Sequence, residues 1–254
     1  MPQGSDDVRS RFAPVAANYV SSEFHAGAER LQEVVELCRP APEDSVLDVA
    51  TGTGNTALAL APHARLVVGL DLTSEMLAQA RRVAAERGVD NVDWVLGDAQ
   101  SLPFCDGSFD LYTVRAASHH FADLAGTLRE ARRVLREGGR AALIDCSAPP
   151  AARDLLHEVE LRRDPSHVRS YTLDEWRDAV EAAGFDIELA DRRELDWDFE
   201  PWMRRMAVPE GEIQALSALI EQSTGEAHAQ LRPGRREGRL WHAYWHALIR
   251  ARRR

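Results

Sequence analysis

The sequence VLDVATGTGN at residues 46–55, followed by RLVVGLD at residues 65–71, decides the fold. Each apolar run carries an acid near its end, Asp48 in the first and Asp71 in the second. The pattern predicts a strand, a tight glycine turn, a short helix and a second strand. Glycine lets the backbone approach a ligand closely, and a carboxylate can accept hydrogen bonds from both ribose hydroxyls. We therefore expect this unit to hold a nucleoside.

Composition limits the classes of function. The chain has 254 residues, of which 44% are hydrophobic, which suits one large α/β domain or two small ones. Its net charge of −10 argues against a nucleic-acid or anionic-membrane partner. The arginine-rich stretch at residues 250–254 is interpreted as a solvated tail. All 31 basic residues are arginine, which excludes lysine Schiff-base chemistry and a Walker-type phosphate loop.

The three cysteines, Cys38, Cys105 and Cys146, lie far apart with no paired spacing. This spacing predicts neither a zinc site nor a disulfide framework, and we expect no bound metal. Reduced thiols are typical of a cytoplasmic protein. Because neither a signal peptide nor a long apolar span is recognised, we expect a cytoplasmic chain without a membrane span.

Strand-like runs and helical segments alternate, which predicts βα units and a parallel sheet. The expected strands are 46–50, 66–70, 92–96, 109–114, 140–145, 185–189 and 240–249. Residues 8–38 read as amphipathic helix. Asp123 is expected to cap a helix with Leu124, Leu128, Ala131 and Leu135 on one face, and Thr172 with Glu175 forms a capping box. Residues 196–232 break the alternation, which favours one domain with a C-terminal insertion.

The glycine turn alone leaves two alternatives open. Gly52, Gly54 and Ala57 fit G-x-G-x-x-A, a pattern that dinucleotide-binding proteins also show. Asp48, however, precedes the glycines, where a carboxylate would attract an ammonium group and repel a pyrophosphate. Asp98 follows the third strand, where it can accept a hydrogen bond from an adenine amino group. These acids favour a sulfonium donor over a dinucleotide.

At this point the chain resembles class I S-adenosylmethionine-dependent methyltransferases. The resemblance rests on LDVATGTG at 47–54, GLDLT at 69–73, GDA at 97–99, LPF at 102–104, FD at 109–110 and RRVLREGG at 132–139. His119-His120-Phe121, Arg163-Asp164-x-Ser166-His167 and Trp202-x-x-Arg205-Met206 extend it to the ubiquinone/menaquinone-biosynthesis type and its uncharacterised bacterial relatives. One departure is Ala50, where the broader family usually has glycine. Alanine is tolerated there if its φ is negative.

The resemblance implies a Rossmann-like, doubly wound, seven-stranded α/β sheet, mostly parallel, with an antiparallel last strand. It also implies one domain over residues 1–254: a helical cap at 1–40, a donor-binding core at 41–148 and an acceptor side at 149–254, with a lid at about 196–232. The implied donor is S-adenosylmethionine, which leaves as S-adenosylhomocysteine. Its expected contacts are Asp48, Ala50, Gly52, Gly54, Asp71, Leu72, Met76, Gly97, Asp98, Ala99 and Arg115.

Alternative roles remain for the two acids on the adenosine side. Asp71 can instead serve a helix N-terminus, where a negative charge is favourable, and Asp98 can form a turn. We favour the binding role for both because several motif pieces agree.

Arg115, His119 and His120 follow the fourth expected strand and should rim the reaction pocket, because ligands of open α/β sheets lie beyond the carboxyl ends of the strands. His120 or His119 is a candidate catalytic base for a hydroxyl or carbon acid. Alternatively, one histidine packs under the donor or caps the next helix. Transfer to a good nucleophile needs mainly in-line alignment.

The expected acceptor contacts are less specific. Tyr19, Ser22 and His25 lie on the first helical region, which closes over the donor in related proteins. Asp164, His167 and Arg169 form a second candidate polar cluster, although an Asp164–Arg169 salt bridge explains two of them equally well. The residues Trp197, Phe199, Trp202, Met203 and Met206 form either an apolar lid or core. His242 and His246 lack a nearby carboxylate, so we reject a metal pair there.

Three functions follow in order. The first is methyl transfer to a small-molecule acceptor. The second is a donor-binding protein that acts as a cyclase or regulator, and the third is a nicotinamide-dependent reductase. The sequence leaves open the acceptor, the choice among carbon, oxygen and nitrogen methylation, and whether the chain is a monomer or a homodimer.

Overall fold

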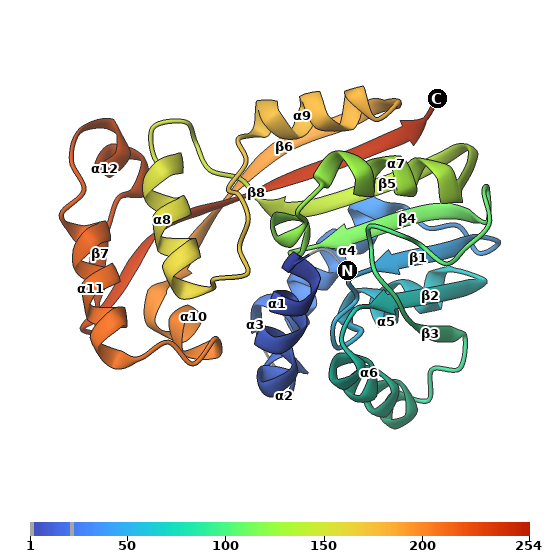
Figure 1. Cartoon of the computed structure of the whole chain (residues 1–254), viewed down its shortest axis with the longest axis horizontal. Coiled ribbons are helices and arrows are strands. Elements are labelled where there is room, and N and C mark those ends of the chain that lie inside the picture. Colours follow the sequence, from blue (N-terminus) through green and yellow to red (C-terminus); the bar gives the residue numbers. More distant parts are fainter. Residues whose placement is uncertain (1–2, 21–22) are drawn as a thin grey trace.

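The apolar runs of the sequence become the central strands of one sheet in the computed structural model, which describes residues 3–20 and 23–254 (Figure 1). The strands are β1 (Ser45–Val49), β2 (Leu66–Asp71), β3 (Val92–Leu96), β4 (Phe109–Arg115), β5 (Leu135–Cys146), β6 (Phe185–Asp198), β7 (Gly234–Arg236) and β8 (Arg239–Arg253). Their order is β3-β2-β1-β4-β5-β8-β6, with β7 paired to β8. β8 runs antiparallel to β5 and β6. The expected seven-strand sheet is confirmed, and β7 adds a short eighth strand.

Helices cover both faces of this sheet, so the expected doubly wound arrangement is confirmed. They are α4 (Ala28–Cys38), α5 (Asn55–Leu60), α6 (Ser74–Arg87), α7 (Leu124–Val134) and α9 (Leu173–Ala182). On one face, Val34 of α4 and Leu60 of α5 pack on Val46 and Val67. On the other, Leu128 of α7 and Trp176 of α9 pack on Leu143. Burial of these apolar side chains is the main force that fixes the layers.

The cap at the N-terminus is helical, as expected, but residues 8–38 do not form one continuous helix. The segments are α1 (Gln3–Phe12), α2 (Ala17–Val20) and α3 (Glu23–Ala26), which precede α4. A single 3-10 turn, Ala13–Val15, follows α1 and contains Pro14, and Gly27 precedes α4 in an extended conformation. Proline and glycine therefore divide the region.

The C-terminal half forms a second lobe around the distal ends of β6 and β8, with helices α8 (Arg153–Arg163), α10 (Phe199–Arg205), α11 (Glu210–Glu221) and α12 (Gly225–Leu231) (Figure 1). The expected limits of the last two long strands were too short. β6 continues to Asp198. It is an edge strand whose outward residues are charged, so its sequence lacks the apolar alternation that would have predicted its full length. Residues 196–198 are strand and not part of an irregular insertion.

The sequence predicted the helix caps more accurately than the strand limits. The Asp123 carboxylate accepts a hydrogen bond from the Gly126 amide at 2.8 Å, and Thr172 with Glu175 forms the expected capping box. Leu135, expected on the α7 face, instead begins β5. Over the described ranges, no helix combines the length and apolar character needed to cross a membrane.

Candidate functional site

The turn between β1 and α5 is held over the end of β2 by Asp71. One oxygen of its carboxylate accepts from the Gly52 amide at 2.8 Å, and the other accepts from the Thr73 amide at 2.8 Å. Asp71 thus connects the glycine turn to the beginning of α6, which also gives it the helix N-terminal role considered above. Each carboxylate oxygen has a second lone pair, so these bonds leave capacity for two ligand hydroxyls.

A cavity opens directly above these residues, at the carboxyl ends of β1, β2 and β4. Its volume is about 1060 Å³ including its mouth. Ten of the eleven expected donor contacts line it, namely Asp48, Ala50, Gly52, Asp71, Leu72, Met76, Gly97, Asp98, Ala99 and Arg115. We call this space the donor cavity.

Gly54, the remaining expected donor contact, does not line the donor cavity. A Cβ at this position would lie 2.5 Å from the Trp94 ring, and the φ of Gly54 is +81°. Glycine is required here for close packing against β3 and for the left-handed backbone at the start of α5. The sequence pattern identified the residue correctly as essential to the turn, but its position favours a packing role.

Ala50 also differs from expectation. Its φ is +52°, in the left-handed region, so the negative φ at which alanine would be tolerated is not present. An alanine in this conformation costs about 1–2 kcal/mol because its Cβ crowds the following carbonyl oxygen. The glycine usual in the broader family would avoid this cost, so the chain keeps a strained residue in the wall of the cavity.

Asp48 is 1% exposed and faces the donor cavity from β1. The Thr51 hydroxyl donates to its carboxylate at 2.5 Å. Burial raises the pKa of Asp48 to about 7, although the Thr51 hydrogen bond and Arg115 oppose that shift. A buried carboxylate of this kind favours a cationic ligand, because a positive charge would offset the cost of its desolvation.

Arg115 extends from the end of β4 and ties three segments together. Its Nε donates to the Thr56 hydroxyl at 3.1 Å, and one terminal nitrogen donates to the His25 carbonyl at 2.6 Å. Burial lowers the pKa of Arg115 to about 10, but Asp48 partly offsets the shift. The guanidinium therefore stays charged at neutral pH and lies where it can attract a donor carboxylate.

Asp98 combines its two alternative roles. Its carboxylate accepts from the Gln100 amide at 2.9 Å, which forms a turn, and the residue also lines the donor cavity. Both are compatible, because the amide uses only one of several lone pairs.

The two adjacent histidines differ in position and in protonation. His119 Nδ1 lies 2.5 Å from an oxygen of Asp145, the acid near the end of β5. Burial lowers the pKa of His119, but the Asp145 charge and hydrogen bond outweigh it, so the net pKa is raised. Burial and the neighbouring His119 charge lower the pKa of His120 to about 4. His119 is the stronger base of the pair. His120 is the member of the pair that lines the donor cavity.

Asp145 is fixed by its own hydrogen bonds. The Ala117 and Ser118 amides donate to one oxygen at 3.1 and 2.6 Å, and the Cys146 amide donates to the other at 2.7 Å. Although His119, Asp145 and Cys146 lie close enough to hold a metal ion, the carboxylate is already saturated by these donors. The arrangement favours an orienting role for Asp145 toward His119.

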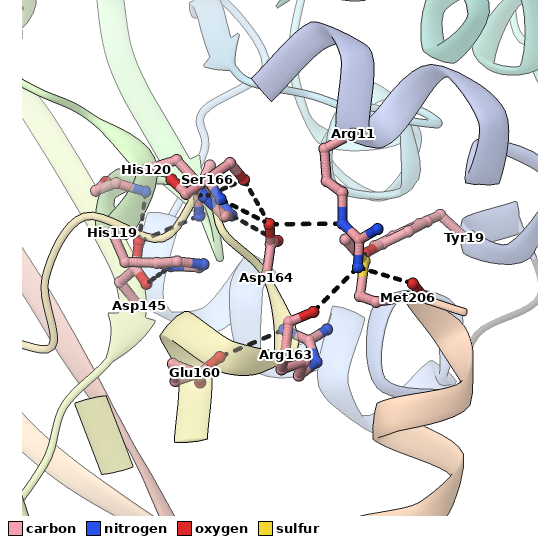
Figure 2. A network of polar contacts seen from close by, with 12 residues as sticks. Arg11, Tyr19, His119, His120, Asp145, Glu160, Arg163, Asp164, Ser166 and Met206 are labelled. Carbon is pink, nitrogen blue, oxygen red and sulfur yellow. Dashed lines mark hydrogen bonds and ion pairs between the residues drawn. The ribbon is translucent and has the colours of Figure 1, made fainter. Parts of the chain in front are cut away.

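A second cavity of about 490 Å³ lies behind the donor cavity, and we call it the rear chamber. Phe12, Tyr19, His25, Ala116 and His120 line both spaces, so the two meet at these residues. The inner wall of the rear chamber includes His119, Asp164, Arg163, Trp202 and Arg205. Figure 2 shows how Asp164 lies between His120 and Ser166 on one side and Arg11 on the other.

The expected acceptor contacts separate into two groups. Tyr19, His25 and Trp202 line the rear chamber, as does Trp197. Three others, His167, Arg169 and Met206, line neither cavity. His167 is buried and hydrogen-bonded to Ser170, and Arg169 is half exposed and paired with Glu175. Met206 is fully buried and accepts from the Tyr19 hydroxyl at 2.9 Å. Ser22 lies outside the described residues.

The aromatic and methionine side chains at the end of β6 and along and just after α10 therefore belong mostly to the core. Phe199, Met203 and Met206 are fully buried within the second lobe, and Trp197 and Trp202 belong to the same cluster while also facing the rear chamber. The alternative Asp164–Arg169 salt bridge is not formed, since Asp164 instead pairs with Arg11 at 3.8 Å.

Sequence reasoning missed Asp145, Arg163 and Arg205 as site residues. Asp145 could have been found, because it lies near the carboxyl end of a central strand, where ligands of such sheets bind. Arg163 and Arg205 belong to helices of the second lobe, and their approach to each other depends on tertiary packing that leaves no local pattern. His246, which we set aside together with His242, also lines the rear chamber.

Comparison with known proteins agrees with this geometry. Residues 47–143 match the family described as a methyltransferase domain. The chain is 34% identical to the uncharacterized methyltransferase YcgJ of Bacillus subtilis, across 85% of this chain and 86% of that protein. It is 39% identical to the ubiquinone/menaquinone biosynthesis C-methyltransferase UbiE of Paracoccus denitrificans, across 56% of this chain and 60% of that protein. A solved structure from Bacillus halodurans C-125 superimposes with a TM-score of 0.83 at 35% identity, covering 89% of this chain and 99% of that one.

Proposed function

This chain belongs to the methyltransferase domain family, and on that premise we propose that it transfers a methyl group from S-adenosylmethionine to a small organic acceptor. In this proposal residues 41–148 bind the donor, and residues 149–254 together with the N-terminal helices enclose the acceptor. The observation that carries it is the pair of carboxylates, Asp48 and Asp71, that face one cavity from neighbouring strands.

The residues of the donor cavity fit S-adenosylmethionine in charge and in hydrogen bonding. Asp48 would hold the ammonium of the methionine part, and Arg115 would attract its carboxylate. Asp71 would bind the ribose hydroxyls with the lone pairs that the Gly52 and Thr73 amides leave available. Leu72 and Met76 would contact the adenine, and Asp98 with Ala99 would contact its edge.

His119 is the proposed base when the acceptor has a proton to lose. An electron pair of the acceptor forms the new bond to the methyl carbon, the carbon–sulfur bond breaks with its pair left on sulfur, and the acceptor proton passes to His119. Asp145 orients the imidazole and stabilises its protonated form. His120 stays neutral at pH 7, because burial holds its pKa at about 4, and it would help to align the reactants where the cavities meet.

Burial of the site would favour the reaction. The positive charge on sulfur disappears during transfer, so a surrounding with little water disfavours the charged reactant more than the transition state. Phe12 and Tyr19 of the N-terminal helices line both cavities and supply apolar walls at their junction. Alignment of donor and acceptor within about 3–3.5 Å would supply much of the remaining acceleration.

A thermal-shift comparison tests the proposed function against the reductase alternative. S-adenosylhomocysteine should raise the melting temperature, since a ligand at 100 times its Kd adds about 2.7 kcal/mol to the free energy of unfolding. NADH should leave the melting temperature unchanged, because its pyrophosphate would meet the Asp48 carboxylate. Stabilisation by NADH and none by S-adenosylhomocysteine would contradict the proposal.

Methyl transfer itself separates an enzyme from a donor-binding protein of another kind. Formation of S-adenosylhomocysteine in the presence of an acceptor, and not in its absence, is the expected result. If a protein that binds the donor forms no S-adenosylhomocysteine with any acceptor, a cyclase or a regulator is favoured.

A further inference from the structure

We propose that the rear chamber binds the carboxylate group of a small, flat, partly apolar acceptor through Arg163 and Arg205. This inference rests on the proposed function only for the placement of the donor next to the chamber. It goes further by naming the charge and shape of the acceptor, which neither the family nor the donor cavity defines.

Two guanidinium groups reach the chamber from different elements of the second lobe. Arg163 is the last residue of α8, and its side chain is 9% exposed. Arg205 is the last residue of α10 and is partly buried. A planar fork of N–H donors matches a carboxylate, which makes arginine the preferred partner for this group.

The hydrogen bonds of the two arginines hold them as part of the wall. Arg163 donates to Glu160 and to the Trp202 carbonyl, at 3.3 and 3.4 Å. Arg205 lies 3.1 Å from Nδ1 of His25, and its guanidinium lies over the Tyr19 ring. These contacts use some N–H groups of each guanidinium, which has five. The side chains are thus positioned before a ligand arrives.

Arginine charges from three elements act on His25, which lines the chamber. Burial lowers the pKa of His25 well below its usual range, and the charges of Arg205, Arg115 and Arg163 lower it further. The same two second-lobe arginines oppose the effect of burial on Tyr19, whose pKa is nevertheless raised. Arg205 itself has a pKa lowered to about 10, by burial and then by the charge of Arg163. An anion placed between the arginines would relieve this repulsion.

Each carboxylate of the chamber has a partner within the protein. Asp145 pairs with His119, and Asp164 accepts from Ser166 and pairs with Arg11 at 3.8 Å (Figure 2). Glu160 accepts from the Tyr244 hydroxyl as well as from Arg163. Glu160 therefore balances Arg163, and its charge also acts on Arg205, so an incoming carboxylate would add a second negative charge beside the two guanidinium groups.

Aromatic rings complete the binding surface. Arg163 lies 4.6 Å from the centroid of Trp202, and Trp197 stacks on Tyr244 with centroids 4.9 Å apart. Phe12 and Tyr19 face the junction with the donor cavity, with their own centroids 5.7 Å apart. A flat apolar body would pack against the sides of these rings that face the chamber. Its nucleophilic atom would then lie toward His119, His120 and the donor.

Equilibrium binding of benzoate and its neutral isostere benzamide tests the inference. Both would be titrated into the full chain saturated with S-adenosylhomocysteine, with tryptophan fluorescence as the signal because Trp197 and Trp202 line the chamber. Benzoate should bind about tenfold more tightly than benzamide, as expected for charge-assisted hydrogen bonds. Equal affinities, or no benzoate binding, would overturn the inference.

Variants of Arg205 test whether this residue causes the preference for benzoate. Arg205→Gln should reduce the benzoate preference to less than about twofold, whereas Arg205→Lys should retain part of it. Arg204→Gln is the matched control, because Arg204 is exposed and pairs with Glu210 at 3.1 Å on the surface. An unchanged preference in Arg205→Gln would overturn the inference. Melting curves of all three variants verify folding, and Arg205→Lys provides the test if Arg205→Gln does not fold.

Failure of the carboxylate-binding inference can be distinguished from failure of the proposed function. S-adenosylhomocysteine binding depends on the donor cavity and is measured first, by its own titration. If it binds while benzoate and benzamide do not differ, only the acceptor class is wrong. If it does not bind, the proposed function is wrong, and benzoate binding to the ligand-free chain then tests the chamber on its own.

Discussion

Ala50 shows how one residue can combine strain with a place in the binding cavity. Its positive φ lets the chain turn sharply after β1, so that the Gly52 amide reaches Asp71. The identity of this residue was evident from the sequence, but its backbone angle was not, because no local pattern distinguishes a strained alanine from a relaxed one.

Replacement of Ala50 by glycine should stabilise the ligand-free protein by about 1 kcal/mol, because glycine adopts this φ without a Cβ clash. Denaturant unfolding measures the change. The control is Ala78→Gly at an exposed position within α6, which should destabilise the protein by about 1 kcal/mol. A loss of stability in Ala50→Gly would contradict the assignment of strain.

If Asp48 binds the donor as proposed, donor binding depends on pH. Because burial raises its pKa to about 7, the folded chain retains a proton that the unfolded chain releases at lower pH. The stability of the ligand-free protein should therefore fall as the pH rises toward and through 7. Asp48→Asn should remove this dependence, and it should weaken donor binding at the same time.

Donor binding should release protons, since the donor ammonium favours the ionised Asp48. At pH 6 the release should approach roughly one proton for each S-adenosylhomocysteine bound, and at pH 8 it should nearly vanish. Calorimetry in buffers of different ionisation enthalpy measures the number. Equal proton release by the wild type and by Asp48→Asn at pH 6 would argue against this role.

The His119–Asp145 pair predicts a second pH dependence. The net pKa of His119 is raised, so its stabilising contribution is complete below its usual 6.5 and is lost as the pH rises through the raised value. The net pKa of Asp145 is lowered, because its pairing with His119 outweighs the opposing effect of burial. Its contribution is present above its usual 3.8 and is lost as the pH falls through the lowered value.

NMR titration of the imidazole nitrogens should give His119 a pKa above 6.5 in the wild type and a lower one in Asp145→Asn. The loss of stability in that variant should be greatest between about pH 4 and 6.5. Asp123→Asn, a change at a surface helix cap, serves as the control. A His119 pKa that is unaffected by Asp145→Asn would contradict the pairing.

At the scale of elements, α1 connects the two lobes across the cavities. One terminal nitrogen of Arg11 donates to the carbonyls of Arg163 and Met206 at 3.0 and 2.9 Å, and Arg9 Nε donates to the Leu72 carbonyl at 3.3 Å. The bonds of Arg11 end on α8 and just after α10, whereas that of Arg9 ends on the donor side. The helix therefore bridges the two sides of the donor cavity, which Val8 and Phe12 help to line, and under the proposed function it would retain the donor.

Arg11→Ala should accelerate release of S-adenosylhomocysteine by about tenfold, because the loss of charge-assisted hydrogen bonds weakens the closed arrangement. Stopped-flow fluorescence measures the release rate. Arg129→Ala provides the control, since the Arg129 side chain is 66% exposed and pairs with Asp123 on the surface. Equal release rates for the wild type and Arg11→Ala would show that α1 does not retain the donor.

The elements themselves were predictable to different degrees. β1, β2 and β4 are buried and apolar, so their sequence marks them clearly. β6 was recognised only at its start, because the cross-strand pairing of charged residues such as Glu188 with Arg250 stabilises it without apolar alternation. The helical cap was predicted in kind, but its division into short helices at Pro14 and Gly27 was not.

At the scale of the whole molecule, two lobes meet at the carboxyl edge of one sheet (Figure 1). The donor side follows from the first β-α-β unit and was largely predictable, since strand ends in such sheets converge. The rear chamber was not, because Arg163, Arg205 and His119 come from segments far apart in the chain. Only packing of the second lobe against the N-terminal helices brings them together.

The central claim is that Asp71 and the glycine turn bind the adenosyl donor, and calorimetric titration of S-adenosylhomocysteine tests it most directly. The wild type should bind with a measurable heat, and Asp71→Ala should lose binding, because it loses the ribose contact and the support of the Gly52 amide. Asp93→Ala, an exposed position on the neighbouring β3, should bind as the wild type does. Undiminished affinity in folded Asp71→Ala would contradict the account.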